Sequence, residues 1–312
     1  MKFFIIALLG FFTLTTNAQN YIDIARINYG NTPLNNFENT SEQTKVEEYG
    51  LQLTFPIVLN EKTVILTGIS ADRSRLRLDP NFLDHSSLNK FRLQLGINQV
   101  HSEKWTGTYV LLPSIASYFE AISMDDFQLG LLTLFTYKRK ENLNYRVGFY
   151  TNTENYGPLF VPLLGLYYLS PNQKFEATLL LPGQADVNYK LAKKTALGMN
   201  FDGMTASYNL NKSISIPKGQ YVVRSSNELY TYLQFQLGKS ILAKTKVGYS
   251  ISRTYKVFDD EDKVDLSLSS LYFGDDRTQL NTNFKEGAIF KVELLYRIHF
   301  NKPKKLNKTG FF

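Results

Sequence analysis

Apolar and polar residues alternate with a period of two along much of this chain. Near the C-terminus Phe290, Val292 and Leu294 share one face, whereas Lys291 and Glu293 lie on the other. The same alternation recurs in four other segments, residues 49–57, 91–98, 143–150 and 229–237. A two-residue period places each set of side chains on one side of a β-sheet. The pattern therefore predicts an all-β protein, and no later apolar run is long enough for a spanning helix.

The lengths of these runs and of their connections favour a barrel in a bilayer. Many runs reach about ten residues, which suits a tilted spanning strand, whereas soluble strands more often have about five or six. Short polar turns are predicted at 60–62, 102–104, 139–142, 170–173, 192–194 and 238–240, between longer polar segments at 30–44, 73–89, 210–220 and 258–287. Short periplasmic turns and longer extracellular loops are typical of outer-membrane barrels. We predict a single antiparallel transmembrane β-barrel of about 14 strands (range 12–16). A soluble sandwich with the apolar face as its core is the alternative.

The N-terminus predicts export. Lys2 carries a positive charge, residues 3–14 are apolar and uncharged, and Ala18 ends a short polar stretch. This order is that of a cleaved secretory signal peptide; a retained anchor is the alternative. We therefore expect a signal peptide at 1–18, an outer-membrane barrel at 19–300 and a Lys-rich tail at 301–312, located in the outer membrane of a Gram-negative bacterium. The chain has no Cys, which excludes disulfides and a lipid-anchored cysteine.

Several segments resemble a known family. They are Asn17–Gln19 at the end of the signal peptide, Phe175–Pro182, Val187–Leu191 and Lys194–Gly198. The chain is similar in these to an uncharacterised family of outer-membrane β-barrels from Bacteroidetes, a domain of unknown function. The resemblance implies a barrel and its location, and it carries no functional residue.

Candidate catalytic and metal-binding groups are sparse. His85, with its neighbours Asp84 and Ser86, lies in a long loop, but adjacent residues rarely form a working triad. The acidic run Asp259–Asp262 could attract a hard cation, yet it lacks the spacing of a calcium loop. The net charge of +7 is dispersed, which argues against a nucleic-acid partner. We therefore expect a protein that is not an enzyme and has no cofactor or metal.

The alternation also predicts which charged side chains line the lumen. The basic ones are Arg92, Arg146, Lys190, Lys244, Lys246, Lys291 and Arg297, and the acidic ones are Glu48, Glu176, Asp186, Glu228 and Glu293. A basic excess would concentrate anions in an open lumen. The same charges could instead pair with one another and fill it.

Three functions follow from this sequence. The first is a passive pore for small solutes with weak anion preference. The second is a structural, ligand-binding or partner-binding barrel with a closed lumen and functional outer loops. The third, a hydrophobic-substrate transporter or lipid hydrolase, would need an opening through the wall or an apolar path. The expected partners are outer-membrane lipid and the barrel-insertion machinery, and the solute is not specified.

Overall fold

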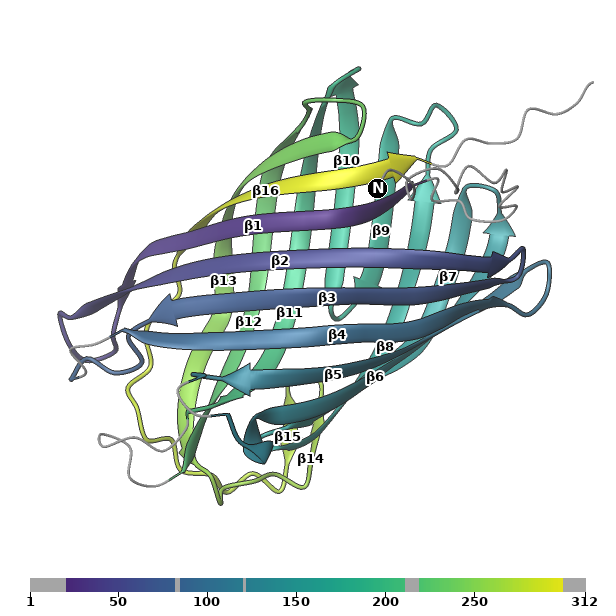
Figure 1. The fold of residues 1–312 in the computed structure, drawn as a ribbon. Helices are drawn as coiled ribbons and strands as arrows, with labels where there is room; N and C mark the ends of the chain where they lie inside the picture. Colours follow the sequence, from purple (N-terminus) through teal and green to yellow (C-terminus); the bar gives the residue numbers. More distant parts are fainter. Residues whose placement is uncertain (1–20, 82–84, 120–121, 211–218, 300–312) are drawn as a thin grey trace, which may run out of the picture.

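The computed structural model describes residues 21–81, 85–119, 122–210 and 219–299, and it shows a closed antiparallel barrel (Figure 1). Fourteen strands form the wall, so the predicted fold class is confirmed. The predicted signal peptide at 1–18 and tail at 301–312 lie outside the described residues. Among those residues, no helix is long and apolar enough to cross a membrane.

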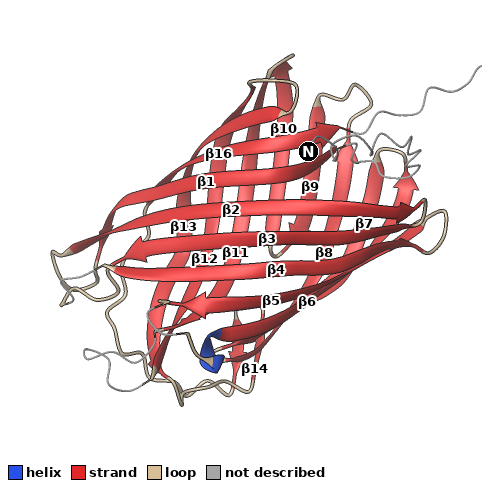
Figure 2. Ribbon diagram, viewed as in Figure 1, coloured by secondary structure: helices blue, strands red, loops and turns tan. Residues whose placement is uncertain are grey.

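The wall strands follow one another in chain order. They are β1 (Tyr21–Asn36), β2 (Gln43–Asn60), β3 (Thr63–Leu76), β4 (Ser86–Val100), β5 (Trp105–Ser117), β6 (Phe127–Lys140), β7 (Leu143–Glu154), β8 (Gly157–Leu169), β9 (Phe175–Leu181), β10 (Gln184–Ala192), β11 (Thr195–Asn209), β12 (Gln220–Gln236), β13 (Ile241–Asp259) and β16 (Ala288–His299). Pairing of β1 with β16 closes the ring. A single 3-10 turn, η1 (Met124–Asp126), precedes β6 (Figure 2). A small hairpin of β14 (Leu266–Leu268) and β15 (Leu271–Phe273) attaches beside β8.

The apolar face of the strands points outward. On β16, Phe290 is 51% exposed and Val292 and Leu294 are each 50% exposed, whereas Glu293 and Leu295 are buried. A soluble sandwich would bury the first three. An outer wall of exposed apolar side chains is stable only in lipid, so this is a transmembrane barrel.

The two ends of the barrel differ. The end that carries Tyr21 and His299, here the inner end, has connections of at most five residues. The opposite, outer end has the long loops, but two of its connections, β7–β8 and β9–β10, are only two residues long. None of the long loops predicted from the sequence falls at these two places. The predicted loops at 30–44 and 73–89 were too long, because β1 continues to Asn36 and β3 to Leu76.

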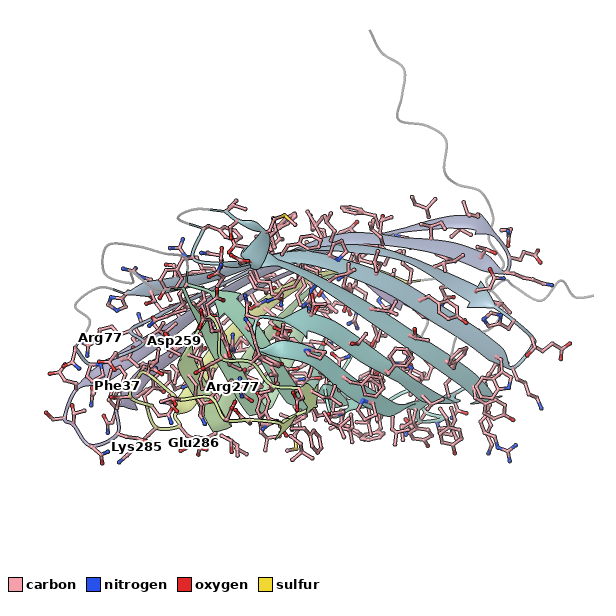
Figure 3. All side chains as sticks on the ribbon, turned by 90° about the horizontal axis from the view of Figure 1, so that it is seen from below. Phe37, Arg77, Asp259, Arg277, Lys285 and Glu286 are labelled. Atoms are coloured by element: carbon pink, nitrogen blue, oxygen red, sulfur yellow. The ribbon has the colours of Figure 1, made fainter. Side chains whose placement is uncertain are left out.

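An apolar cluster fills the lumen at the outer end. We call it the outer plug, and its members are Phe37, Val46, Leu76, Leu78, Leu88, Ala116, Ala206, Tyr208, Leu210, Val222, Tyr255, Val257 and Phe284. Phe37 marks this end in Figure 3. Asn209 of β11 also pairs with Ser117 of β5, although these strands are not neighbours in the wall. Their direct contact means that the barrel is flattened where the plug lies.

Candidate functional site

A layer of buried charge lies directly beneath the outer plug. Its centre is Arg224 of β12, which is 5% exposed. Arg224 forms an ion pair with Glu48 of β2, and its Nη2 lies 3.3 Å from Oε1 of Glu228. Its Nη1 also donates to Ser74 Oγ at 3.2 Å, and Tyr230 donates to Glu228 Oε2 at 2.6 Å. One guanidinium thus joins Glu228 of its own strand to Glu48 of β2.

Two further polar clusters occupy the same depth as the plug. Arg253 of β13 is fully buried, and its Nη1 donates to Thr32 Oγ1 at 2.8 Å; it also bonds Asn35. Lys90 of β4 donates to Gln128 Oε1 at 2.8 Å. Buried polar groups of this kind are costly unless they are paired, so their bonds hold the outer half in one arrangement.

The inner half of the lumen is hollow. A cavity of about 560 Å³ is lined by residues of β1, β7 to β13 and β16. We call it the inner vestibule. Its described lining includes seven Lys or Arg and five Asp or Glu side chains. The vestibule therefore carries a formal excess of two positive charges.

Most charges in the inner vestibule are paired. Arg297 forms a bidentate contact with Asp23, at 2.6 and 3.0 Å, and its guanidinium lies 3.6 Å from the centre of the Tyr21 ring. Lys246 Nζ lies 2.7 Å from Glu293 Oε1. A second set pairs Lys244 with Asp186 at 3.3 Å; Asp186 also accepts from Tyr232, while Tyr21 and Tyr167 both donate to Glu176 Oε1.

Three basic side chains of the vestibule differ from the rest. No carboxylate of a described residue lies within ion-pair distance of Arg146 on β7, Lys190 on β10 or Lys193, which follows β10. Arg146 is partly buried, and the residue beside it on β8 is Gly165, which has no side chain to cover it. An arginine in this setting presents a planar donor to whatever enters the cavity.

The structure places the predicted lumen residues at two depths. The inner vestibule contains Arg146, Lys190, Lys244, Lys246, Arg297, Glu176, Asp186 and Glu293. Glu48 and Glu228 belong instead to the charge layer around Arg224. Arg92 lies 3.5 Å from the Tyr150 hydroxyl, and Lys291 lies over the Tyr230 ring at 5.7 Å.

Sequence reasoning missed Arg224, Arg253 and Asp23. Arg224 precedes the predicted Glu228 by four residues, so the same register would have found it. Arg253 follows Ser252, whose φ of 54° interrupts the regular geometry of β13. The period-two pattern does not predict this interruption. Asp23 lies at a register shift between β1 and β16, in the strand whose alternation is weakest.

Neither a metal-holding cluster nor an open aromatic site is seen among the described lumen residues. In the described part of the chain, no group of three or more His, Asp or Glu side chains is placed to hold a metal ion. Tyr230 and Tyr232 of β12 are each 1% exposed and donate to carboxylates. They fill space, and the accessible donors of the lumen are its cations.

Comparison with known proteins adds the following. Solved structures that are similar include an outer membrane channel from Pseudomonas putida F1, with 7% identity, coverage of 89% of this chain and 95% of that one, and a TM-score of 0.46. The NanC porin has 8% identity, coverages of 88% and 100%, and a TM-score of 0.38. The translocator domain of the autotransporter NalP from Neisseria meningitidis has 11% identity, coverages of 91% and 91%, and a TM-score of 0.36. Among curated proteins, none matches this chain.

A family model describes nearly the whole barrel. It matches residues 14–296, which include every wall strand except the last three residues of β16. The chain therefore belongs to the family described as Domain of unknown function (DUF6268).

Proposed function

We propose that this protein is an outer-membrane barrel that is closed at its outer end and binds small anionic solutes in its inner vestibule. The observation that carries the proposal is the combination of a filled outer half with unpaired cations in the hollow inner half. We place the inner end in the periplasm, because termini and short turns lie there in such barrels. The cleaved signal peptide, the Bacteroidetes origin, the delivery by barrel-insertion machinery and the absence of enzymatic activity are part of the same proposal.

Closure of the lumen follows from the outer plug and the charge layer. A hydrated ion that leaves the vestibule would have to cross a section lined by buried apolar side chains. It would also have to displace Arg224 from two carboxylates. Each step removes water or a partner from a charge, which costs several kcal/mol. Passage therefore needs a rearrangement of the outer half.

The anionic class of the solute follows from Arg146 and Lys190. Both cations face a cavity with a positive excess, and neither is neutralised by a described carboxylate. A carboxylate or phosphate would supply the missing partner, and arginine binds such groups through two parallel hydrogen bonds. The cavity volume limits the solute to a small molecule.

A passive pore with weak anion preference is the second candidate. The positive excess of the inner vestibule favours it, because anions would be concentrated at the entrance of any open path. This candidate differs from the first proposal in one requirement. The outer plug must move out of the lumen in the ligand-free protein.

Conductance in planar bilayers distinguishes the closed barrel from the passive pore. We expect the refolded wild-type protein to be silent and the double variant Leu78→Ala with Phe284→Ala to conduct with anion preference. Steady wild-type conductance would overturn closure and favour the passive pore.

Calorimetric titration with citrate, and separately with inorganic phosphate, tests the vestibule. Arg146→Gln should weaken binding about tenfold, which corresponds to about 1.4 kcal/mol. Arg139→Gln, an exposed change near the β6–β7 turn, is the matched control and should leave binding unchanged. Equal binding by both variants would contradict the assigned role of Arg146.

A further inference from the structure

A groove of about 430 Å³ lies on the lipid-facing side of the wall, near the inner end. It spans four consecutive strands, β5 to β8, which lie side by side (Figure 1). The residues that line it are Trp105, Tyr137, Tyr145, Arg146, Val147, Leu164 and Gly165. Most of these present a ring or an aliphatic group, so the groove is apolar.

Three aromatic residues form one row across the groove. The ladder places Trp105 opposite Tyr137, and Tyr137 opposite Tyr145, so the three rings stand at one level on neighbouring strands. The centres of the Trp105 and Tyr137 rings are 5.1 Å apart. Tryptophan and tyrosine near the ends of spanning strands mark the boundary between hydrocarbon and headgroups. The row therefore sets the depth of the membrane interface on this part of the wall.

The groove extends from this row toward the middle of the bilayer. Val147 follows Tyr145 by two residues on β7, and its partner in the ladder is Leu164 of β8, which is 65% exposed. Arg146 pairs with Gly165 between these levels. The side chain of Arg146 faces the inner vestibule and Gly165 has none, so no outward side chain fills the space between the apolar walls. Such a space fits a flexible hydrocarbon chain.

Basic residues lie on the other side of the aromatic row, toward the inner end. The β4–β5 connection, and the last three residues of β6 with the β6–β7 connection, together contain four Lys or Arg and two Glu side chains. Lys104 directly precedes Trp105, and Lys140 pairs with Leu143, two residues before Tyr145. A register shift immediately before Lys140 brings it onto the outer face that Leu143 and Tyr145 share. Both lysines are exposed, so they can meet a group at the membrane surface.

We propose that this groove binds a phospholipid with an anionic headgroup, whose acyl chain lies in the groove and whose phosphate lies against Lys104 and Lys140. Each residue advances about 3.4 Å along a strand, so Lys140 lies about 7 Å to one side of the aromatic row and Val147 about 7 Å to the other. Phosphate, glycerol esters and hydrocarbon follow one another in the same order in a lipid. The basic excess selects a negative headgroup. The groove is on the lipid side of the wall, so this site is separate from the inner vestibule.

Trp105 reports the occupant directly, because it is the only tryptophan and it lines the groove. The wild-type protein is refolded in phosphatidylcholine vesicles that contain increasing fractions of phosphatidylglycerol with brominated acyl chains, which quench indole fluorescence on contact. Brominated phosphatidylcholine is the reference lipid, and folding is verified by heat-modifiable gel migration. Quenching by the brominated phosphatidylglycerol should reach half-saturation at a fraction at least fivefold lower than quenching by the reference lipid.

Two matched sets of variants locate the site. Lys104→Gln with Lys140→Gln should raise the half-saturating fraction of phosphatidylglycerol at least fivefold, and Lys104→Arg with Lys140→Arg should retain the wild-type value. Lys62→Gln with Lys239→Gln removes the same charge from two other exposed turns and should have little effect. Val147→Phe should weaken saturable quenching because the larger ring fills the groove. Val292→Phe, on the lipid-facing side of β16, should not.

Four results would overturn this assignment. Quenching in proportion to the fraction of either lipid would show only the lipid that surrounds any barrel. Equal half-saturation by both lipids would contradict the anionic headgroup, and equal effects of the two lysine pairs would contradict its position. Absence of quenching by both lipids would mean that another occupant, such as a second copy of this chain, covers the groove.

Discussion

Replacing Arg224 with glutamine should strongly destabilise the barrel. The change removes a guanidinium that joins Glu48 and Glu228 in a site with almost no solvent access. Glutamine cannot neutralise either carboxylate, and both would remain buried on facing walls of the lumen. The contact of Arg224 with the Tyr255 ring, 5.6 Å from its centre, would also be lost.

The magnitude follows from the burial. Breaking a buried ion pair by removing one partner costs about 3–5 kcal/mol, because it leaves a charge without compensation. Here two carboxylates share one cation, so the upper half of that range is expected. Removing all three charges together, with Arg224→Met, Glu48→Gln and Glu228→Gln, should recover much of the loss, since the two uncompensated carboxylates would then be absent.

The assay is urea unfolding of the refolded protein in lipid vesicles. Trp105 is the only tryptophan, and it lies on the outer wall against Tyr137, so its fluorescence reports release from the membrane. The control is Lys45→Gln, which breaks an exposed pair with Glu47 and should change stability little, because water screens this pair.

One result would refute the reasoning. If Arg224→Gln costs no more than Lys45→Gln, the carboxylates of the charge layer must be solvated. A solvated layer implies a water-filled lumen at that depth, and the closed barrel would then be wrong.

Three other outcomes are expected. Phe284→Ala should lower stability by about 3–5 kcal/mol in urea unfolding, because it truncates a buried ring of the outer plug. Gly198→Ala should cost about 1–3 kcal/mol, since a Cβ there would lie 2.3 Å from the Tyr232 ring, whereas Gly238→Ala meets no atom within 4 Å and should be neutral. Hydrogen bonds from its arginine partner hold the pKa of Asp275 below its usual range, so this pair stabilises the long loop above about pH 4 and is lost as the pH falls through the lowered pKa. The protection factors of amides in the loop, which correct for the intrinsic pH dependence of exchange, should therefore fall at low pH in wild type, and protection factors that stay constant would contradict this.

The wall could be predicted well from the sequence, because every strand needs apolar side chains at the positions that face lipid. Phe290, Val292 and Leu294 must all be apolar, since each faces hydrocarbon, and this requirement produces the period-two alternation. Outside the bilayer the strands no longer need an apolar face. Asn31 and Asn36 lie on the outer part of β1, where the ladder continues without an apolar face, and sequence reading therefore ended the strand too early.

The lumen could be predicted only in part. Period-two alternation indicates which face a charge takes, and it identified Arg146 and Lys190 as lumen residues by their position, although it missed Lys193. It does not show which charges meet, since Arg224 and Glu48 are far apart in the chain. The outer plug was missed for the same reason: its members come from strands and loops across the chain, and only the flattening of the barrel brings them together.

The pairing of β1 with β16 has a consequence for assembly. Every other wall contact joins strands that follow one another along the chain, apart from the step from β13 to β16 across the long loop. Until the last strand arrives, the polypeptide is an open sheet with two bare edges, and such edges recruit other chains. Loss of β16 would therefore yield an aggregation-prone ribbon and not a narrower cylinder. The seam between the first and last strands makes insertion a late, all-or-none event that requires the complete chain.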